Sequence, residues 1–174
     1  MIYAYSGVEP KFGPNVFLAP GALIVGDVEL DDGTNIWFYS VIRGDVHYVR
    51  IGRDTNIQDH CMLHVTGGQF PLIIGNEVVV GHRAVLHGCT IHDRTLIGIG
   101  ALVLDGAVVE EGAIVAAGAV VTPGSTIQSN SVVAGIPAQH IREVSDEDHA
   151  YQAKTCHNYR SYAARFNDLV KPVY

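Results

Sequence analysis

The sequence has little charge. Asp, Glu, Lys and Arg make up 17% of its 174 residues, against about a quarter in ordinary soluble domains. The 18 acidic residues outnumber the 11 basic ones, the formal net charge is −7, and no run is rich in Lys or Arg. We therefore expect neither nucleic acid nor an anionic membrane as a partner. Hydrophobic residues make up 48%, which excludes a disordered chain. So sparsely charged a surface predicts that another subunit covers part of it.

Cysteine is also scarce. The three cysteines, Cys61, Cys89 and Cys156, stand at unrelated spacings, and such an odd set is not a disulfide framework. A reducing compartment is therefore expected, with the cytoplasm as the default. We interpret Cys61 and Cys89 as packed thiols. Residues 1–13 have neither a basic start nor a long apolar run, so we expect neither a signal peptide nor a membrane-spanning segment.

An internal repeat of six residues covers roughly residues 11–138. Its clearest part has Ile or Val at every sixth position, and a small residue follows four positions after nearly every one. The aliphatic series is Ile91, Ile97, Val103, Val109, Val115, Val121, Ile127 and Val133. Breaks fall near residues 47–50, near residues 66–72 and just before Ile91. A period of six predicts short strands joined by turns, three of them to a triangular coil of about 18 residues.

The pattern changes after Pro137. Ser145 precedes a run of acidic residues, which is typical of a helix start with a capping box. Aromatic and aliphatic residues then recur at spacings of three or four. This pattern predicts one amphipathic helix over about residues 146–169, which ends before Pro172 and packs along the prism or on a neighbouring subunit.

Three of the nine histidines have the spacing of candidate metal ligands. His64 and His82 are 18 residues apart, so they can stack one coil above the other, although the break near residues 66–72 leaves this register open. His82 and His87 are separated by about 15 Å of extended chain, whereas zinc holds each imidazole nitrogen at about 2.0–2.1 Å. We therefore hypothesise sites shared between chains of a threefold oligomer, with His64 and His87 from one subunit and His82 from its neighbour. Solvated histidines without a metal are the alternative.

Four polar residues, in two segments about one coil apart, are not at inward positions of the repeat: Arg43, Asp45, Gln58 and Asp59. Arg43 can form a bidentate pair with a carboxylate, and Asp59 is the candidate partner. One interpretation is a salt bridge between subunits. The functional interpretation adds Gln58 as the group that orients a water molecule or substrate at a metal.

A resemblance to a known family rests on four motifs set on the hexapeptide repeat. They are IRGD at 42–45, NIQD at 56–59, LH at 63–64 and VGHRAVLHG at 80–88. With them, the chain resembles the gamma-class carbonic anhydrase family over nearly its whole length. The resemblance implies an all-β fold, a left-handed parallel β-helix over residues 1–140, with residues 141–174 forming the C-terminal helix. It also implies a homotrimer and a bound metal ion, Zn²⁺ or else Fe²⁺ or Co²⁺.

The resemblance also assigns roles by motif. It implies His64, His82 and His87 as the metal ligands, with His82 from the adjacent subunit. It further implies an interface ion pair (Arg43 and Asp59), residues that line the metal site (Asp45 and Gln58), a supporting polar residue (Asn56) and a helix tyrosine near the metal (Tyr159). His60 departs from the pattern, since a small residue usually stands there.

The implied reaction is the reversible hydration of CO₂ to bicarbonate, because a metal held by three neutral imidazoles activates water near neutral pH. Residues 65–71 lack the acidic residues that the archetypal enzyme carries in a proton-transfer loop, which predicts slow proton transfer. Three alternatives stay open. They are a metal-dependent acyl-CoA thioesterase, a metal-free hexapeptide acyltransferase and a non-enzymatic trimeric scaffold.

Overall fold

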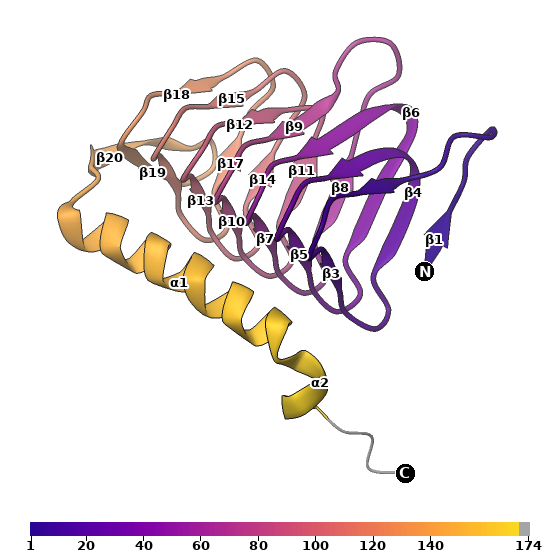
Figure 1. Ribbon diagram of the computed structural model, residues 1–174. Helices are drawn as coiled ribbons and strands as arrows, with labels where there is room; N and C mark the ends of the chain where they lie inside the picture. The colour runs from indigo at the N-terminus through magenta and orange to yellow at the C-terminus, as the bar shows by residue number, and fades with distance from the viewer. Residues whose placement is uncertain (171–174) are drawn as a thin grey trace.

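The computed structural model describes residues 1–170, which form a parallel β-helix with a helix along one side (Figure 1). The predicted β-helix of hexapeptide repeats with a C-terminal helix is confirmed. Each coil of the prism contributes to three faces, which we call first, second and third in chain order. Within residues 1–170, no helix is apolar over a length that would cross a membrane.

The first face holds β3 (Phe17–Leu18), β5 (Asn35–Ile36), β7 (Asn56–Ile57), β10 (Val79–Val80), β13 (Leu96–Ile97), β16 (Ile114–Val115) and β19 (Ser131–Ala134). The second face holds the first halves of β4 (Leu23–Leu30) and β6 (Val41–Ile51), then β8 (Met62–His64), β11 (Val85–His87), β14 (Leu102–Val103) and β17 (Val120–Val121). The third face holds β2 (Lys11–Phe12), the second halves of β4 and β6, then β9 (Leu72–Ile74), β12 (Thr90–Ile91), β15 (Val108–Val109) and β18 (Thr126–Ile127).

Two short strands close the ends of the prism. Strand β1 (Ile2–Tyr3) pairs with β4, and β20 (Gln139–Glu143) runs antiparallel to β19. The inward aliphatic positions of the repeat are buried in one continuous core. The packing of aliphatic side chains inside the coils, with small residues at the corners, therefore accounts for the six-residue period.

The breaks in the repeat correspond to coils of unequal length. In the regular part, Leu102 pairs with Val120, 18 residues later. Earlier, residues 45–48 of β6 bulge opposite the single residue Asp27, because Gly26 pairs with Gly44 and Val28 with Val49. A second insertion is the loop closed by the bridge between Thr66 and Phe70.

The C-terminal segment begins as predicted and ends differently. Ser145 caps α1 (Asp146–Ala164) through a capping box with Asp148. The single helix predicted to residue 169 is wrong, because the chain bends at Arg165 and resumes as α2 (Phe166–Leu169). The bend brings the ring of Phe166 against those of Phe17, Trp37 and Phe38. The predicted end before Pro172 lies outside the described residues.

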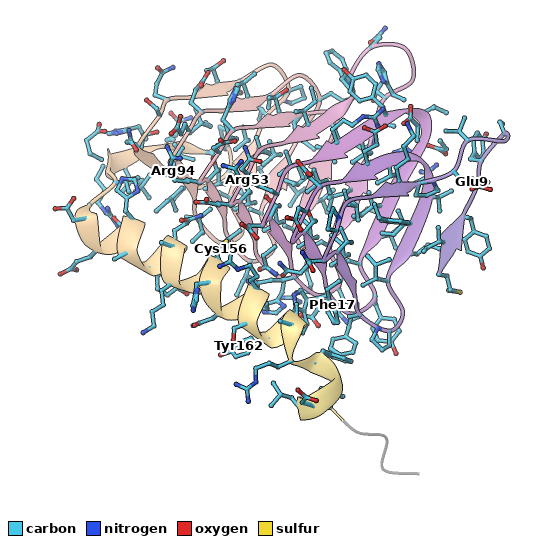
Figure 2. All side chains as sticks on the ribbon, in the orientation of Figure 1. Glu9, Phe17, Arg53, Arg94, Cys156 and Tyr162 are labelled. Carbon is cyan, nitrogen blue, oxygen red and sulfur yellow. The ribbon has the colours of Figure 1, made fainter. Side chains whose placement is uncertain are left out.

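All three cysteines are free and buried. Burial raises the pKa of Cys61 to about 12 and also raises the pKa of Cys89, which agrees with packed thiols. Cys156 lies between α1 and the β-helix (Figure 2), where its thiol donates to the carbonyl of Asp54.

Candidate metal centre

His64 and His87 lie side by side at the end of the second face. Strands β8 and β11 pair in register, with His87 next to His64, and Nδ1 of His64 is 3.0 Å from Nε2 of His87. The suggested stacking of His64 with His82 is wrong. The loop at residues 66–70 lengthens this coil, so the residue in register with His64 is His87, 23 positions later.

A carboxylate holds the other nitrogen of each ring. His64 Nε2 lies 3.0 Å from Asp45 Oδ1, and His87 Nδ1 lies 2.6 Å from Asp105 Oδ1. An imidazole that donates one N–H to a carboxylate presents a lone pair at its second nitrogen. Two such lone pairs therefore face each other across 3.0 Å, an arrangement that requires a shared proton or a cation between them.

This arrangement fits a metal ion. Two nitrogens bound tetrahedrally at 2.0–2.1 Å from one zinc ion lie about 3.3 Å apart, close to the observed separation. Metal-bound histidines also usually donate their second N–H to a carboxylate or carbonyl. The pair would thus supply two of the nitrogens that such an ion needs.

Both carboxylates are held in the charged form. Burial alone would raise the pKa of Asp45, but hydrogen bonds from His64 and Arg43 outweigh it, and the pKa falls below its usual value. For Asp105, hydrogen bonds from His87 and Thr66 outweigh burial in the same way and lower the pKa.

Asp105 was missed in the sequence. Asp105 stands 18 residues after His87, which is the length of one regular coil. This spacing was the signal that could have placed its side chain next to His87.

Arg43 contacts Asp45 within the chain. The predicted Arg43–Asp59 pair is not made within residues 1–170 of a single chain, where Asp59 instead contacts His82. The pair stays a prediction for an interface between subunits.

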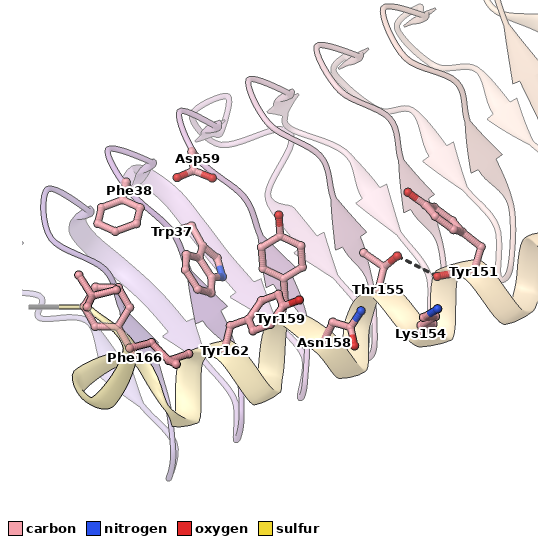
Figure 3. A pocket seen from close by; sticks show the side chains of 12 residues that line it. Trp37, Phe38, Asp59, Tyr151, Lys154, Thr155, Asn158, Tyr159, Tyr162 and Phe166 are labelled. Carbon is pink, nitrogen blue, oxygen red and sulfur yellow. Dashed lines mark hydrogen bonds between the residues drawn. The ribbon is translucent and has the colours of Figure 1, made fainter.

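His82 lies at the opposite edge of the second face, beneath α1. Its Nδ1 is 2.8 Å from Asp59 Oδ2, and its Nε2 is 3.4 Å from the Tyr159 hydroxyl. The Tyr159 ring packs edge-on against Trp37 at 5.2 Å between centroids (Figure 3). Burial, with a further contribution from Asp59, raises the pKa of Tyr159, so its hydroxyl stays protonated at neutral pH.

A buried chain of amide side chains supports the backbone of His82. The His82 amide donates to Gln58 Oε1 at 3.2 Å, and Gln58 Nε2 donates to Asn56 Oδ1 at 3.1 Å. Asn56 Nδ2 donates in turn to Asn35 Oδ1, which also accepts from Trp37 Nε1. Both ends of the Gln58 amide are thus engaged within the chain, and Gln58 fixes the turn that carries His82.

The two histidine groups are separated by the width of the second face. Strand geometry places His82 about 15 Å of extended chain from His87. Among the residues that the structure describes, one chain brings together no group of three His, Cys, Asp or Glu side chains that could hold a metal ion. A three-histidine site would therefore require two copies of the chain.

A groove opens between the C-terminal helices and the β-helix (Figure 3), close to the side chains that contact His82. Its volume is about 650 Å³, and its walls include Asp59 and Tyr159, both of which contact His82. Aromatic side chains from both sides, among them Trp37, Phe38 and Tyr162, form half of the other lining residues.

Comparison with known proteins gives one family match and several close relatives. Residues 88–123 match the family described as "Bacterial transferase hexapeptide (six repeats)". The chain is 54% identical to a "Probable carbonic anhydrase" of Methanocaldococcus jannaschii over 77% of this chain and 84% of that protein. It is 45% identical to "Gamma carbonic anhydrase 1, mitochondrial" of Arabidopsis thaliana over 94% of this chain and 62% of that protein.

A solved structure from Bacillus cereus, described as a presumed acetyltransferase, superposes with a TM-score of 0.94. It is 40% identical, and the match covers 98% of each chain. The fold is thus shared over its full extent with a protein whose description differs from those of the sequence relatives.

Proposed function

The chain belongs to the gamma carbonic anhydrase family, and from this premise we propose that it forms a homotrimer that hydrates CO₂ reversibly at metal sites between its subunits. Each site combines His64 and His87 of one subunit with His82 of its neighbour. The observation that carries the proposal is the approach of His64 Nδ1 and His87 Nε2 to 3.0 Å, each ring being held from behind by a carboxylate.

The outward side chains of the second face support the trimer. They form an aliphatic ladder in which each coil contributes one half-buried residue, namely Leu23, Val41, Met62, Val85, Leu102 and Val120. Helix α1 packs on the first face instead, and the third face carries the charged group Lys11, Glu29 and Arg50. An uncovered aliphatic face typically marks a protein interface.

The positions of the histidines at the two edges of this face suit threefold symmetry. His82 marks one edge, and the His64–His87 pair marks the other. A rotation of 120° that joins one edge to the opposite edge of the next copy would close a ring of three subunits and create three equal sites. The same apposition would bring Arg43 to Asp59 of the neighbour.

When bound, a zinc-type ion would lower the pKa of a water molecule to about 7, and this is how it would supply the nucleophile for CO₂. The chain's own residues orient the ligands. Asp45, Asp59 and Asp105 each hold one imidazole. Tyr159 places a hydroxyl beside His82. The segment at residues 65–71 offers no acid to carry the released proton, so we expect proton transfer to limit the rate.

The test is CO₂ hydration measured by stopped flow on metal-loaded trimer. His64→Ala and His82→Ala should each abolish hydration, as should a chelator. Co-expression of the two variants should restore about a quarter of the wild-type rate, since random mixing leaves about one site in four with all three histidines.

Two outcomes would contradict the proposal. No rescue in mixed trimers would refute sites shared between subunits. No hydration from a protein shown to hold metal would leave the metal site in place and exclude CO₂ as the substrate.

The groove between the C-terminal helices and the β-helix favours a second candidate, hydrolysis of an acyl-CoA thioester at the same site. A volume of about 650 Å³ is far larger than CO₂ requires and suits an organic substrate. Thioester hydrolysis that stops on chelation would support this candidate. Acyl transfer that survives chelation would support a metal-free acyltransferase instead, and a trimer that falls apart on chelation without either activity would indicate a scaffold.

A further inference from the structure

We propose that Asp105 and Thr66 form a positioning pair that orients His87 and sets how tightly the chain holds its metal ion. The inference rests on the proposed metal site and adds two residues to it. Neither residue touches the space between His64 and His87. Both act through the His87 ring.

The contacts form a short line from the loop to the ring. Thr66 Oγ1 donates to Asp105 Oδ2 at 2.8 Å, and the other oxygen, Oδ1, accepts from His87 Nδ1 at 2.6 Å. The side chains of His87 and Asp105 are each about one-third exposed (33% and 32%). Because Thr66 donates to one oxygen and His87 to the other, the Asp105 carboxylate is fixed at both oxygens. The hydrogen bond to Nδ1 determines which nitrogen of His87 faces His64.

The backbone next to His87 leaves room for this carboxylate. Gly88 has φ +53, and a Cβ atom at this position would collide with Oδ1 of Asp105. A side chain at residue 88 would thus push the carboxylate away from the His87 ring. The glycine that follows His87 is needed for the contact as well as for the turn.

The loop at residues 66–70 holds the pair in place. The Thr66–Phe70 bridge closes the loop, and the Phe70 side chain lies against Gly88 and Gly106, so that a Cβ at either glycine would meet it. This segment carries no acid for proton transfer. Its contacts give it a different task, which is to hold Asp105 against His87.

The same design occurs on the other ring. One oxygen of Asp45 accepts from His64, and the other contacts Arg43. Asp45 and Asp105 thus each join one imidazole to a second anchoring group, Arg43 or Thr66. A carboxylate behind a metal-bound imidazole fixes the ring and raises its basicity, and its loss typically lowers metal affinity about 10–100-fold.

The experiment measures Zn²⁺ affinity by competition with a chromophoric chelator and records the visible absorption spectrum of the Co²⁺-loaded trimer. Asp105→Ala should weaken Zn²⁺ binding about 10–100-fold and alter the Co²⁺ spectrum. Asp105→Asn keeps an oxygen acceptor, so its loss should be smaller. Thr66→Val removes only the anchoring hydroxyl and should give the smallest loss of the three.

The matched control is Asp93→Asn. Asp93 is a corner carboxylate that accepts from the backbone and side chain of Asn76, and it contacts no histidine among the described residues. The Zn²⁺ affinity and the Co²⁺ spectrum of the Asp93→Asn variant should equal those of the wild type. Circular dichroism and trimer mass identify any variant that fails to fold, in which case Asp105→Asn and Thr66→Val decide the question.

The outcomes separate this inference from the proposed function. Wild-type affinity and an unchanged Co²⁺ spectrum in folded Asp105 and Thr66 variants would overturn the positioning pair alone. A wild-type trimer that binds neither Zn²⁺ nor Co²⁺ would overturn the proposed metal site, and this inference with it.

Discussion

The coils after Ile91 and the coils between Trp37 and Cys89 share one six-residue repeat but differ at the corner between the first and second faces. From the N-terminus, this corner carries Gly21, Tyr39, His60, Arg83, Gly100 and Gly118, all with φ between +59 and +82. At this corner of the later coils the left-handed conformation falls on glycine, which adopts it freely, whereas another corner carries Arg94 and Asn130 at φ +55 and +52. In the earlier coils it falls on residues with side chains, at a typical cost of about 1–2 kcal/mol each.

The proposed ligands lie in the earlier coils. His82 stands directly before Arg83, and Asp59 stands directly before His60. Coils of 18 residues stack every position above its equivalent, whereas the insertions at residues 45–48 and 66–70 displace the chain from that pattern. Regular repeats thus build the prism, and the coils whose length departs from 18 residues carry most of the polar side chains of the site. Asp105 is the contribution of the later coils to the site.

The largest expected effect is the loss of stability when a core side chain of the later coils is removed. Ile97 is fully buried, and Ile97→Ala should lower the free energy of unfolding by about 2–5 kcal/mol, because the cavity adds to the lost burial. His82→Ala in the earlier coils should lower it by only about 1 kcal/mol in the metal-free protein, because it removes a partly exposed side chain and its contact with Asp59.

Chemical denaturation of both variants checks this division, with metal affinity measured on the same samples. Ile97→Ala should keep its metal affinity, and His82→Ala should lose it. Equal stability losses in the two variants would show that the site and the scaffold are not separable in this way.

The sequence alone predicts the structure of the later coils better than that of the earlier coils. The series from Ile91 to Val133 predicts its own burial and register, because each inward side chain depends only on the coils directly above and below. The pairing of His64 with His87 could not be read from a period of 18, since it depends on how many residues the loop adds. A residue that contacts the site from an adjacent coil, such as Asp105, can be assigned to the site only once that register is known.

Two further features depend on tertiary contacts. The bend at Arg165 brings Phe166 to the aromatic cluster around Trp37, and no local signal in the helix pattern marks it. Arg43 contacts Asp45 in the single chain, although the sequence motif points to Asp59. The Arg43–Asp59 pair stays a prediction for an interface between subunits, which a single chain does not contain.

An effect of intermediate size is expected on the pH dependence of stability, to which the corner residue Cys61 contributes. The later coils carry alanine at this place in the repeat, for example Ala101 and Ala107. Burial raises the pKa of Cys61 from 9 to about 12, so its neutral form stabilises the fold fully below pH 9. This contribution is lost as the pH rises from about 9 towards 12, because the unfolded chain then ionises first.

Cys61→Ala should therefore change stability little at pH 7 and make it less sensitive to pH above 9. Urea denaturation at pH 7, 9 and 10.5 measures both effects. The surface variant Asp93→Asn is the control, since it leaves all three thiols in place. An identical alkaline decline in Cys61→Ala would assign that decline to other groups.

The smallest expected effect tests whether the strained corner serves His82. Gly100 has φ +67 and open space where a Cβ would be, so Gly100→Ala isolates backbone strain and should cost about 1 kcal/mol of stability without altering metal affinity. Arg83 has φ +60. Arg83→Gly relieves similar strain but frees the unfolded chain, so its net stability should shift by about 0.5 kcal/mol or less.

Measurements of metal affinity then test whether the restricted backbone at residue 83 helps to position His82. A glycine at residue 83 widens the range of conformations open to the turn that carries His82, and we expect Zn²⁺ binding to weaken by about 2–5-fold, since imprecise ligands bind less tightly. Arg83→Ala removes the same guanidinium yet keeps the backbone restricted, so it should bind like the wild type. Should Arg83→Ala lose as much affinity as Arg83→Gly, the side chain would be the cause, and the left-handed corner would serve only to turn the chain.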